Sequence, residues 1–165
     1  MPDQSSNPPA AGNVRLRAVS ESDLLIFYEQ QLDPAATRMA AFPAREREAH
    51  MAHWHKIQAQ AGVINRTILF DEQVAGNIVS WDQAGKRELG YWLGRQYWGQ
   101  GIATRALALF LAQVSARPLY AHVAKHNLAS QRVLQKCGFI HDSEDRGFPV
   151  EPGGEPVEEW IVVLW

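Results

Sequence analysis

The sequence predicts a mixed α/β domain of the α+β kind, with about four helices around a twisted, mostly antiparallel central sheet of about seven strands. Three observations support this prediction. Segments with strand and helix patterns follow each other in mixed order along the chain. The connections within a central group of three strands are too short for crossovers, so these strands pair antiparallel. A helix joins the third of them to the next strand, which makes that pair parallel.

The 165 residues fit one domain, which we place at residues 13–165 behind a loose tail at residues 1–12. The net charge of −2 argues against a protein that coats nucleic acid. We find no apolar run of about 18 residues that spans a membrane, and the tail lacks the features of a signal peptide. We therefore expect a cytoplasmic protein with no nucleic-acid or membrane partner.

The first third of the domain predicts one strand and two helices. Alternating apolar and polar residues indicate a short strand at 14–19. Ser20 and Asp23 have the spacing of a helix N-cap and an acidic N3 position, so a helix of about 12 residues follows. Residues 35–42 fit neither pattern. A second helix is expected at 43–61, because it opens with a proline and is followed by a glycine.

The middle of the domain, where the residue pattern changes from Ile64 on, predicts a meander of three strands, at residues 67–70, 74–81 and 87–94. Short polar turns separate these strands. The third strand places three apolar side chains on one face, namely Leu89, Tyr91 and Leu93.

The last third predicts two helices and three strands. The expected order is a helix at 102–114, a strand at 119–123, a helix at 127–136, a strand from 139, a loop at 143–156 and a strand at 157–165. We assign the loop because that segment holds three prolines and three glycines.

Residues 96–101, Gln-Tyr-Trp-Gly-Gln-Gly, connect the meander to a helix that we expect to begin near Gly99. The first N–H groups of a helix lack internal partners and, with the helix dipole, attract anions. Gly99 and Gly101 leave room for a phosphate, and Arg95 and Arg105 flank the turn. The spacing fits neither a Walker loop nor a dinucleotide fingerprint. A purely structural turn and a phosphate site of another kind both stay open at this point.

Three motifs in order resemble the GNAT superfamily of N-acetyltransferases, over residues 14–165. Residues 96–103 are similar to the family's loop for the acyl-CoA pyrophosphate, Gln-x-x-Gly-x-Gly followed by Ile-Ala. Residues 88–93, Glu-Leu-Gly-Tyr-Trp-Leu, are similar to its fourth strand. Residues 127–130 and 136–139 are similar to its second cofactor motif. The resemblance is closest to the branch that contains ribosomal-protein N-terminal acetyltransferases.

The resemblance implies the GNAT fold, in which the fourth and fifth strands splay apart and acetyl-CoA lies in the gap as co-substrate, with no metal. Leu93 and its neighbours then contact the pantetheine arm, and backbone N–H groups at 99–104 take the pyrophosphate. Asn127 bonds the pantetheine arm and Ser130 lies near the thioester sulfur. The implied cofactor-binding residues are Leu93, Gln96, Gly99, Gln100, Gly101, Ile102, Ala103, Thr104, Asn127 and Ser130.

Acyl transfer to an amine requires a base, because only the neutral amine attacks the thioester. Glu88 is the candidate catalytic base, either directly or through water, and Ser130 is the candidate proton donor to the leaving thiolate. Many family members carry a tyrosine at the position of Val133 or Leu134, and this chain has none there. Structural roles stay open: Glu88 as a solvated strand-end charge, Ser130 as a helix-surface hydroxyl and Asn127 as a helix cap.

Two further groups of residues suggest chemistry without supporting it. His50, His53 and His55 lie in one predicted helix, but no cysteine or carboxylate set completes a metal site with them. We expect them at the surface or lining an amine pocket. Cys137, the one cysteine, is expected to pack as a small core residue.

The leading hypothesis is therefore an N-acetyltransferase that moves an acetyl group from acetyl-CoA to a primary amine by direct attack in a ternary complex. The amine belongs either to a small molecule or to a protein N-terminus. Two alternatives stay open: a non-catalytic acyl-CoA-binding or regulatory module of the same fold, and a nucleotide-binding domain of another fold. A homodimer through the C-terminal strands is a further hypothesis.

Overall fold

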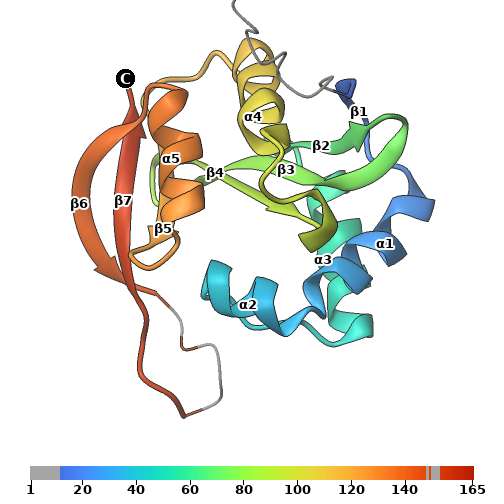
Figure 1. Ribbon diagram of the computed structural model, residues 1–165, viewed down its shortest axis with the longest axis horizontal. Helices are drawn as coiled ribbons and strands as arrows, with labels where there is room; N and C mark the ends of the chain where they lie inside the picture. Colours follow the sequence, from blue (N-terminus) through green and yellow to red (C-terminus); the bar gives the residue numbers. More distant parts are fainter. Residues whose placement is uncertain (1–11, 148, 150–152) are drawn as a thin grey trace, which may run out of the picture.

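The computed structural model describes residues 12–147, 149 and 153–165, and it contains one seven-stranded sheet with helices on both faces (Figure 1). The strand order is β1-β2-β3-β4-β5-β7-β6. Strands β4 and β5 are parallel and the other neighbours are antiparallel, which confirms the expected sheet. The strands are β1 Val14–Arg17, β2 Ile64–Phe70, β3 Gln73–Gln83, β4 Lys86–Leu93, β5 Leu119–Ala124, β6 Ile140–Arg146 and β7 Glu158–Leu164.

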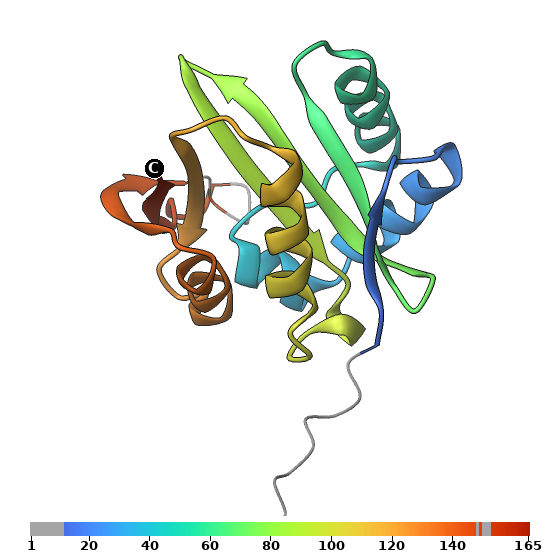
Figure 2. The same cartoon turned by 90° about the horizontal axis from the view of Figure 1, so that it is seen from above.

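The described residues form five α-helices where about four were expected. Helices α4 and α5 cover one face of the sheet, while α1 and α3 cover the other (Figure 2). The helices are α1 Glu21–Gln31, α2 Pro34–Ala40, α3 Arg47–Ala59, α4 Ile102–Gln113 and α5 Leu128–Lys136. The expected tail at residues 1–12 lies, except for Gly12, outside the described residues.

Two apolar cores fill the spaces between the sheet and these helix layers. On one face, Phe110 of α4 is fully buried among residues that include Leu89 of β4. On the other face, Phe27 of α1 packs on Trp54 of α3, with ring centroids 4.8 Å apart. Because side chains alternate along a strand, Leu89 faces α4 while its neighbour Glu88 faces away from α4.

Helix α2 occupies residues that the sequence left unassigned. Pro34 takes the first turn, where its missing N–H is not needed. The side chain of Asp33 caps this turn by accepting a hydrogen bond from the N–H of Ala35 at 2.9 Å. Ala41 then ends the helix in a left-handed conformation.

Helix α3 begins at Arg47, so the expectation of a helix from residue 43 is wrong. The Gln31 side chain explains this late start. Its amide donates to the Arg45 carbonyl at 2.8 Å and accepts from the Arg45 N–H at 3.1 Å. These bonds fasten the connecting segment to the end of α1, so it does not enter the helix until Glu46 has turned the chain.

Strand β6 extends through residues that were expected in the late loop. Residues 143–146 pair with β7, for example Asp145 with Glu159, so the expected start of the loop is wrong. The polar composition of this segment is typical of a loop. Strand β7 nevertheless supplies it with a complete row of backbone partners, which composition does not reveal.

A buried ion pair joins the start of α1 to the sheet. Asp23 is only 1% exposed and pairs with Arg17 at 2.6 Å. Its carboxylate also accepts hydrogen bonds from the Thr67 hydroxyl at 2.7 Å and the Ser20 N–H at 2.9 Å, which confirms the predicted N-terminal cap of this helix. Burial by itself raises the pKa of Asp23, but these bonds outweigh it and lower the pKa to about 2.

Candidate active site

Strands β4 and β5 part after three paired positions. The parallel ladder runs from Arg87 opposite Leu119 to Leu89 opposite Ala121, and β4 continues without it to Leu93. The described pairings therefore leave the β5-facing edge of β4 open beyond Leu89. This is the splayed pair that the resemblance implied, and it leaves a gap in the strand pairing near the middle of the sheet.

The turn after β4 ends in two glycines with left-handed backbones. A short 3-10 helix, Arg95–Tyr97, comes first, and the Trp98 indole donates to the Leu93 carbonyl at 3.0 Å, which holds the turn over the end of β4. Gly99 has φ +72° and Gly101 has φ +75°, and no atom lies within 4 Å of a Cβ placed on either.

Helix α4 begins at Ile102, where the predicted helical run starts and not as early as Gly99, because the left-handed Gly101 is its N-cap. A glycine in this position offers no side-chain oxygen to the first N–H groups of the helix, and the structure shows no side-chain cap bond there. These N–H groups thus face an open space beside the glycines, which is the geometry of an anion site at a helix N-terminus.

A cavity of about 410 Å³ lies between the parted end of β4, this turn and α5. Residues of β4, of the turn and of α5 form most of the cavity wall, and α2 closes one side with Met39 and its neighbours. Eight of the ten residues predicted to bind the cofactor line it: Leu93, Gly99, Gly101, Ile102, Ala103, Thr104, Asn127 and Ser130.

The other two predicted cofactor residues lie in the turn but do not line this cavity. The side chain of Gln100 donates to the carbonyl of Gln96 at 2.9 Å, so Gln100 closes the turn on itself. The Gln100 side chain is therefore engaged within the turn.

The cations beside the cavity are not those expected from the sequence. Arg95 pairs with Asp33 at 3.6 Å, and Arg105 donates to the carbonyl of Gly12, so both flanking arginines are engaged elsewhere. Arg132 and Lys136, on successive turns of α5, line the cavity instead.

A tyrosine that sequence reasoning did not single out for chemistry meets Ser130 in the cavity. The Tyr91 hydroxyl lies 2.5 Å from the Ser130 Oγ, and the Ser130 N–H donates to the Asn127 side chain at 3.1 Å. Asn127 therefore caps α5 while it lines the cavity. Burial raises the pKa of Tyr91 to about 12, so the phenol keeps its proton at neutral pH. The strand period already placed Tyr91 beside Leu93, which was the signal available for it.

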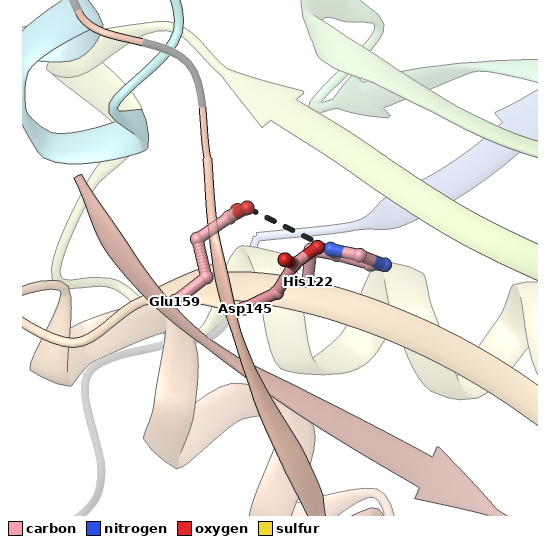
Figure 3. Close-up of side chains that lie close together, drawn as sticks. All are labelled: His122, Asp145 and Glu159. Atoms are coloured by element: carbon pink, nitrogen blue, oxygen red, sulfur yellow. Dashed lines mark ion pairs between the residues drawn. The ribbon is translucent and has the colours of Figure 1, made fainter. Parts of the chain in front are cut away.

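Strands β4, β5, β6 and β7 carry a charged cluster on the sheet face that Glu88 occupies. The His122 ring lies between two carboxylates, with Nε2 3.6 Å from Glu88 and Nδ1 3.7 Å from Glu159. Figure 3 shows that Asp145 reaches the same ring, and one oxygen or nitrogen from each of His122, Asp145 and Glu159 lies within 4.8 Å of the others. Glu159 and then Glu88 raise the pKa of His122 to about 10, so the ring is an imidazolium at neutral pH.

The family model described as the acetyltransferase (GNAT) domain matches residues 13–140, well over half of the chain. The chain belongs to the GNAT acetyltransferase family. In this chain the open end of β4 and the glycine turn at the start of α4 line one cavity.

This GNAT chain is similar to the protein named putative ribosomal N-acetyltransferase YdaF of Bacillus subtilis (strain 168), with 25% identity over 107 residues. The match covers 61% of this chain and 58% of that protein, so the chain matches little more than half of the length of that relative. The name agrees with the resemblance to the ribosomal-protein branch.

Solved structures share the same GNAT fold. Mycobacterium smegmatis RimJ in complex with CoA-disulfide superimposes with a TM-score of 0.76 at 22% identity, over 93% of this chain and 82% of that one. A putative acetyltransferase from T. thermophilus gives a TM-score of 0.69 at 26% identity, over 92% of this chain and 85% of that one. A nucleotide-binding domain of another fold is therefore the wrong alternative for this chain.

The three histidines of α3 do not share one site, and the expected surface or pocket position is wrong for His50. His50 is buried with Nε2 2.8 Å from the Leu24 carbonyl, and His55 pairs with Glu21 at 2.9 Å. Burial lowers the pKa of His53 to about 4, so this ring is neutral at pH 7.

Cys137 is half-buried and packs against the α4-side core, and its burial raises the pKa of the thiol. A protonated thiol in this position agrees with the expected packing role rather than that of a nucleophile. The described helices include none that is both long and apolar enough to cross a membrane.

Proposed function

We propose that this protein transfers an acetyl group from acetyl-CoA to a primary amine by direct attack in a ternary complex. One observation carries the proposal. The gap where β4 leaves β5 opens directly beside the left-handed glycines at the start of α4, within a chain of the GNAT family. A ligand with an anionic end and an extended arm fits both parts at once.

The open cradle at Gly99 and Gly101 supports a pyrophosphate in that place, because a phosphate approaches the free N–H groups without meeting a side chain. The positively charged side chains of Arg132 and Lys136 at the cavity wall also favour a negatively charged ligand group. The free edge of β4 up to Leu93 offers backbone groups to the pantetheine arm, and Asn127 offers its amide. Mycobacterium smegmatis RimJ, which shares the fold, was solved with a CoA derivative.

Acetyl-CoA supplies an activated carbonyl, and the protein's side chains move the protons. Glu88 accepts a proton from the ammonium form of the acceptor, directly or through one water, so that the neutral nitrogen bonds to the carbonyl carbon. After the attack the nitrogen still carries a surplus proton, which passes to water. As the carbon–sulfur bond breaks, Ser130 donates a proton to the departing sulfur and receives one from Tyr91 through their 2.5 Å hydrogen bond, and water returns a proton to Tyr91. An N–H of the open edge of β4 stabilises the negative charge that develops on the carbonyl oxygen.

The acceptor is proposed as a protein N-terminus or a small-molecule amine. The name of the Bacillus subtilis relative supports the first class. A cytoplasmic location and a homodimer through the C-terminal strands stay predictions. The non-catalytic module drew its support from the absence of a tyrosine on α5. Tyr91 brings a phenol to Ser130 from β4 instead, which favours the enzyme.

The test is a panel of amines and unblocked peptides, with CoA release as the readout and acetyl-CoA binding followed by calorimetry. With at least one acceptor of the panel the protein is expected to release CoA from acetyl-CoA, and with the N-acetylated form of that acceptor it is expected to release none. Glu88→Gln should lower turnover by about 10²- to 10⁴-fold and leave the affinity for acetyl-CoA within about twofold. Glu72→Gln is the matched control, because Glu72 pairs with Arg15 at the surface, 2.6 Å away. Tight acetyl-CoA binding without turnover on the whole panel would establish the binding module instead.

A further inference from the structure

Glu88 lies at the point where the two parallel strands separate. It occupies the second of the three paired positions, opposite Tyr120, and the ladder ends one residue later. His122 is the first residue of β5 beyond the ladder. The two side chains therefore meet beside the end of the ladder, on the sheet face opposite to α4, whereas Tyr91 meets Ser130 on the α5 side.

The His122 ring is held on both of its nitrogens. Nε2 faces Glu88 at 3.6 Å and Nδ1 faces Glu159 at 3.7 Å, so three adjacent strands contribute one residue each to a chain of charges. The two carboxylates flank the imidazolium on opposite sides and attract it electrostatically. Asp145 of the edge strand adds a third carboxylate beside the ring (Figure 3).

Glu88 depends on this arrangement because it is only 8% exposed. A carboxylate that is withdrawn from water favours its neutral form unless a cation lies beside it. Among the described residues, the ion pairs place one cation against the Glu88 carboxylate, namely His122. A base that must accept a proton from an ammonium group needs the ionised form.

We propose that His122, paired with Glu159, is a positioning residue that holds and stabilises the Glu88 carboxylate beside the start of the gap. This inference rests on the proposed function and extends it to two residues that do not touch the thioester. The three side chains with Asp145 carry a net charge of −2, which also favours an acceptor that arrives as an ammonium ion.

In the reaction, Glu88 takes one proton from the ammonium nitrogen, and that nitrogen forms the bond to the acetyl carbon. His122 stays an imidazolium throughout and stabilises Glu88 until the proton has arrived. The charged groups beside His122 are Glu88 and Glu159 on the neighbouring strands β4 and β7, and Asp145 on β6, the strand beyond β7.

The experiment compares His122→Gln and Glu159→Gln with the wild-type chain, using an acceptor from the panel. His122→Gln should lower kcat by about 10- to 100-fold and leave the KM for acetyl-CoA within about twofold. It should also move the acidic limb of the kcat/KM profile to higher pH by about 1–3 units, which is the effect of removing an opposite charge at this distance. Glu159→Gln should lower kcat by a smaller factor and leave the acidic limb in place, because His122 stays protonated in that pH range.

His141→Gln is the matched control, because His141 lies on β6 with its ring against Trp160 at 4.6 Å, outside the cluster. It should leave kcat and the pH profile unchanged. A His122→Asn variant and thermal melts of each protein separate a folding defect from a lost positioning role. An unchanged acidic limb in folded His122→Gln and His122→Asn overturns the inference while wild-type turnover still supports the proposed function. A wild-type chain that needs added Zn²⁺ and loses activity in EDTA also overturns it, since the cluster would then be a metal site.

Discussion

Replacement of Gly101 by alanine tests whether the turn before α4 binds the anionic part of CoA. Gly101 has φ +75° with open space around its Cβ position, so the added methyl group points where a phosphate is proposed to lie. Gly85, in the turn between β3 and β4, has φ +76° and the same open space. Gly85→Ala is therefore a control with the same backbone strain at a place remote from the cavity.

The folding cost of both substitutions follows from the backbone. A left-handed conformation costs a residue with a Cβ about 1–2 kcal/mol, and the reduced freedom of the unfolded chain offsets about 0.4–1 kcal/mol of this. We expect each variant to lose about 1 kcal/mol of unfolding free energy, or about 2–4 °C in Tm for a chain of this size. Differential scanning calorimetry of the two variants should give equal shifts.

The binding cost should appear in one variant only. Loss of one charge-assisted hydrogen bond costs about 1.5–3 kcal/mol, which corresponds to about a 10- to 100-fold rise in the Kd for CoA. Isothermal titration calorimetry with CoA at a temperature well below both melting points measures it. If Gly101→Ala weakens CoA binding no more than Gly85→Ala does, the anion site does not lie at this turn.

Three further predictions concern groups with unusual surroundings. Tyr91→Phe should lower kcat by about tenfold without changing the Kd for CoA. Added to Ser130→Ala, the same substitution should lower kcat no further, because the phenol acts through Ser130. Additive losses of kcat in steady-state assays would contradict this. The pKa of Asp23 is lowered from 3.8 to about 2, so its ionised form stabilises the fold above pH 3.8 and this stability is lost as pH falls through 2. Urea unfolding should therefore show Asp23→Asn about 2 kcal/mol less stable at pH 7 and the difference shrinking near pH 2. The pKa of His122 is raised from 6.5 to about 10, so its ion pairs stabilise the fold fully below pH 6.5, and this stability is lost as pH rises through 10. Nitrogen NMR should find an imidazolium at pH 8 that is easier to deprotonate in Glu159→Gln. A neutral ring at pH 8 in the wild type would contradict the proposed pairing of His122 with the two glutamates.

The local signals in the sequence predicted most elements. Ser20 and Asp23 marked the start of α1 because a cap is made within four residues. The short turns of the meander permitted only antiparallel pairing, and the helix before β5 required a parallel pair. Local signals failed where a distant residue decided the outcome. The hydrogen bonds of Gln31 to Arg45 made α3 begin later than predicted, and pairing with β7 placed residues 143–146 in a strand.

The same distinction between local and distant contacts applies to the candidate site. The spacing of Gly99 and Gly101 before a helix indicated an anion site, because helix N-termini bind anions through groups adjacent in the chain. The contact of Tyr91 with Ser130 spans 39 residues and depends on which face of β4 meets α5. Such contacts depend on strand register and helix packing, which the spacing of residues along the chain does not specify.

The sequence by itself determined the family, the mixed sheet with its parallel pair, and the turn at Gln96–Gly101, since each is encoded by neighbouring residues or by the lengths of connections. Only the tertiary structure decided what surrounds the reacting groups. It brought Glu88, His122 and Glu159 together from three strands, although β7 lies more than thirty residues after β5 in the chain. The physical reason is that strand order in a sheet sets side-chain neighbours, whereas the strands themselves follow from local patterns.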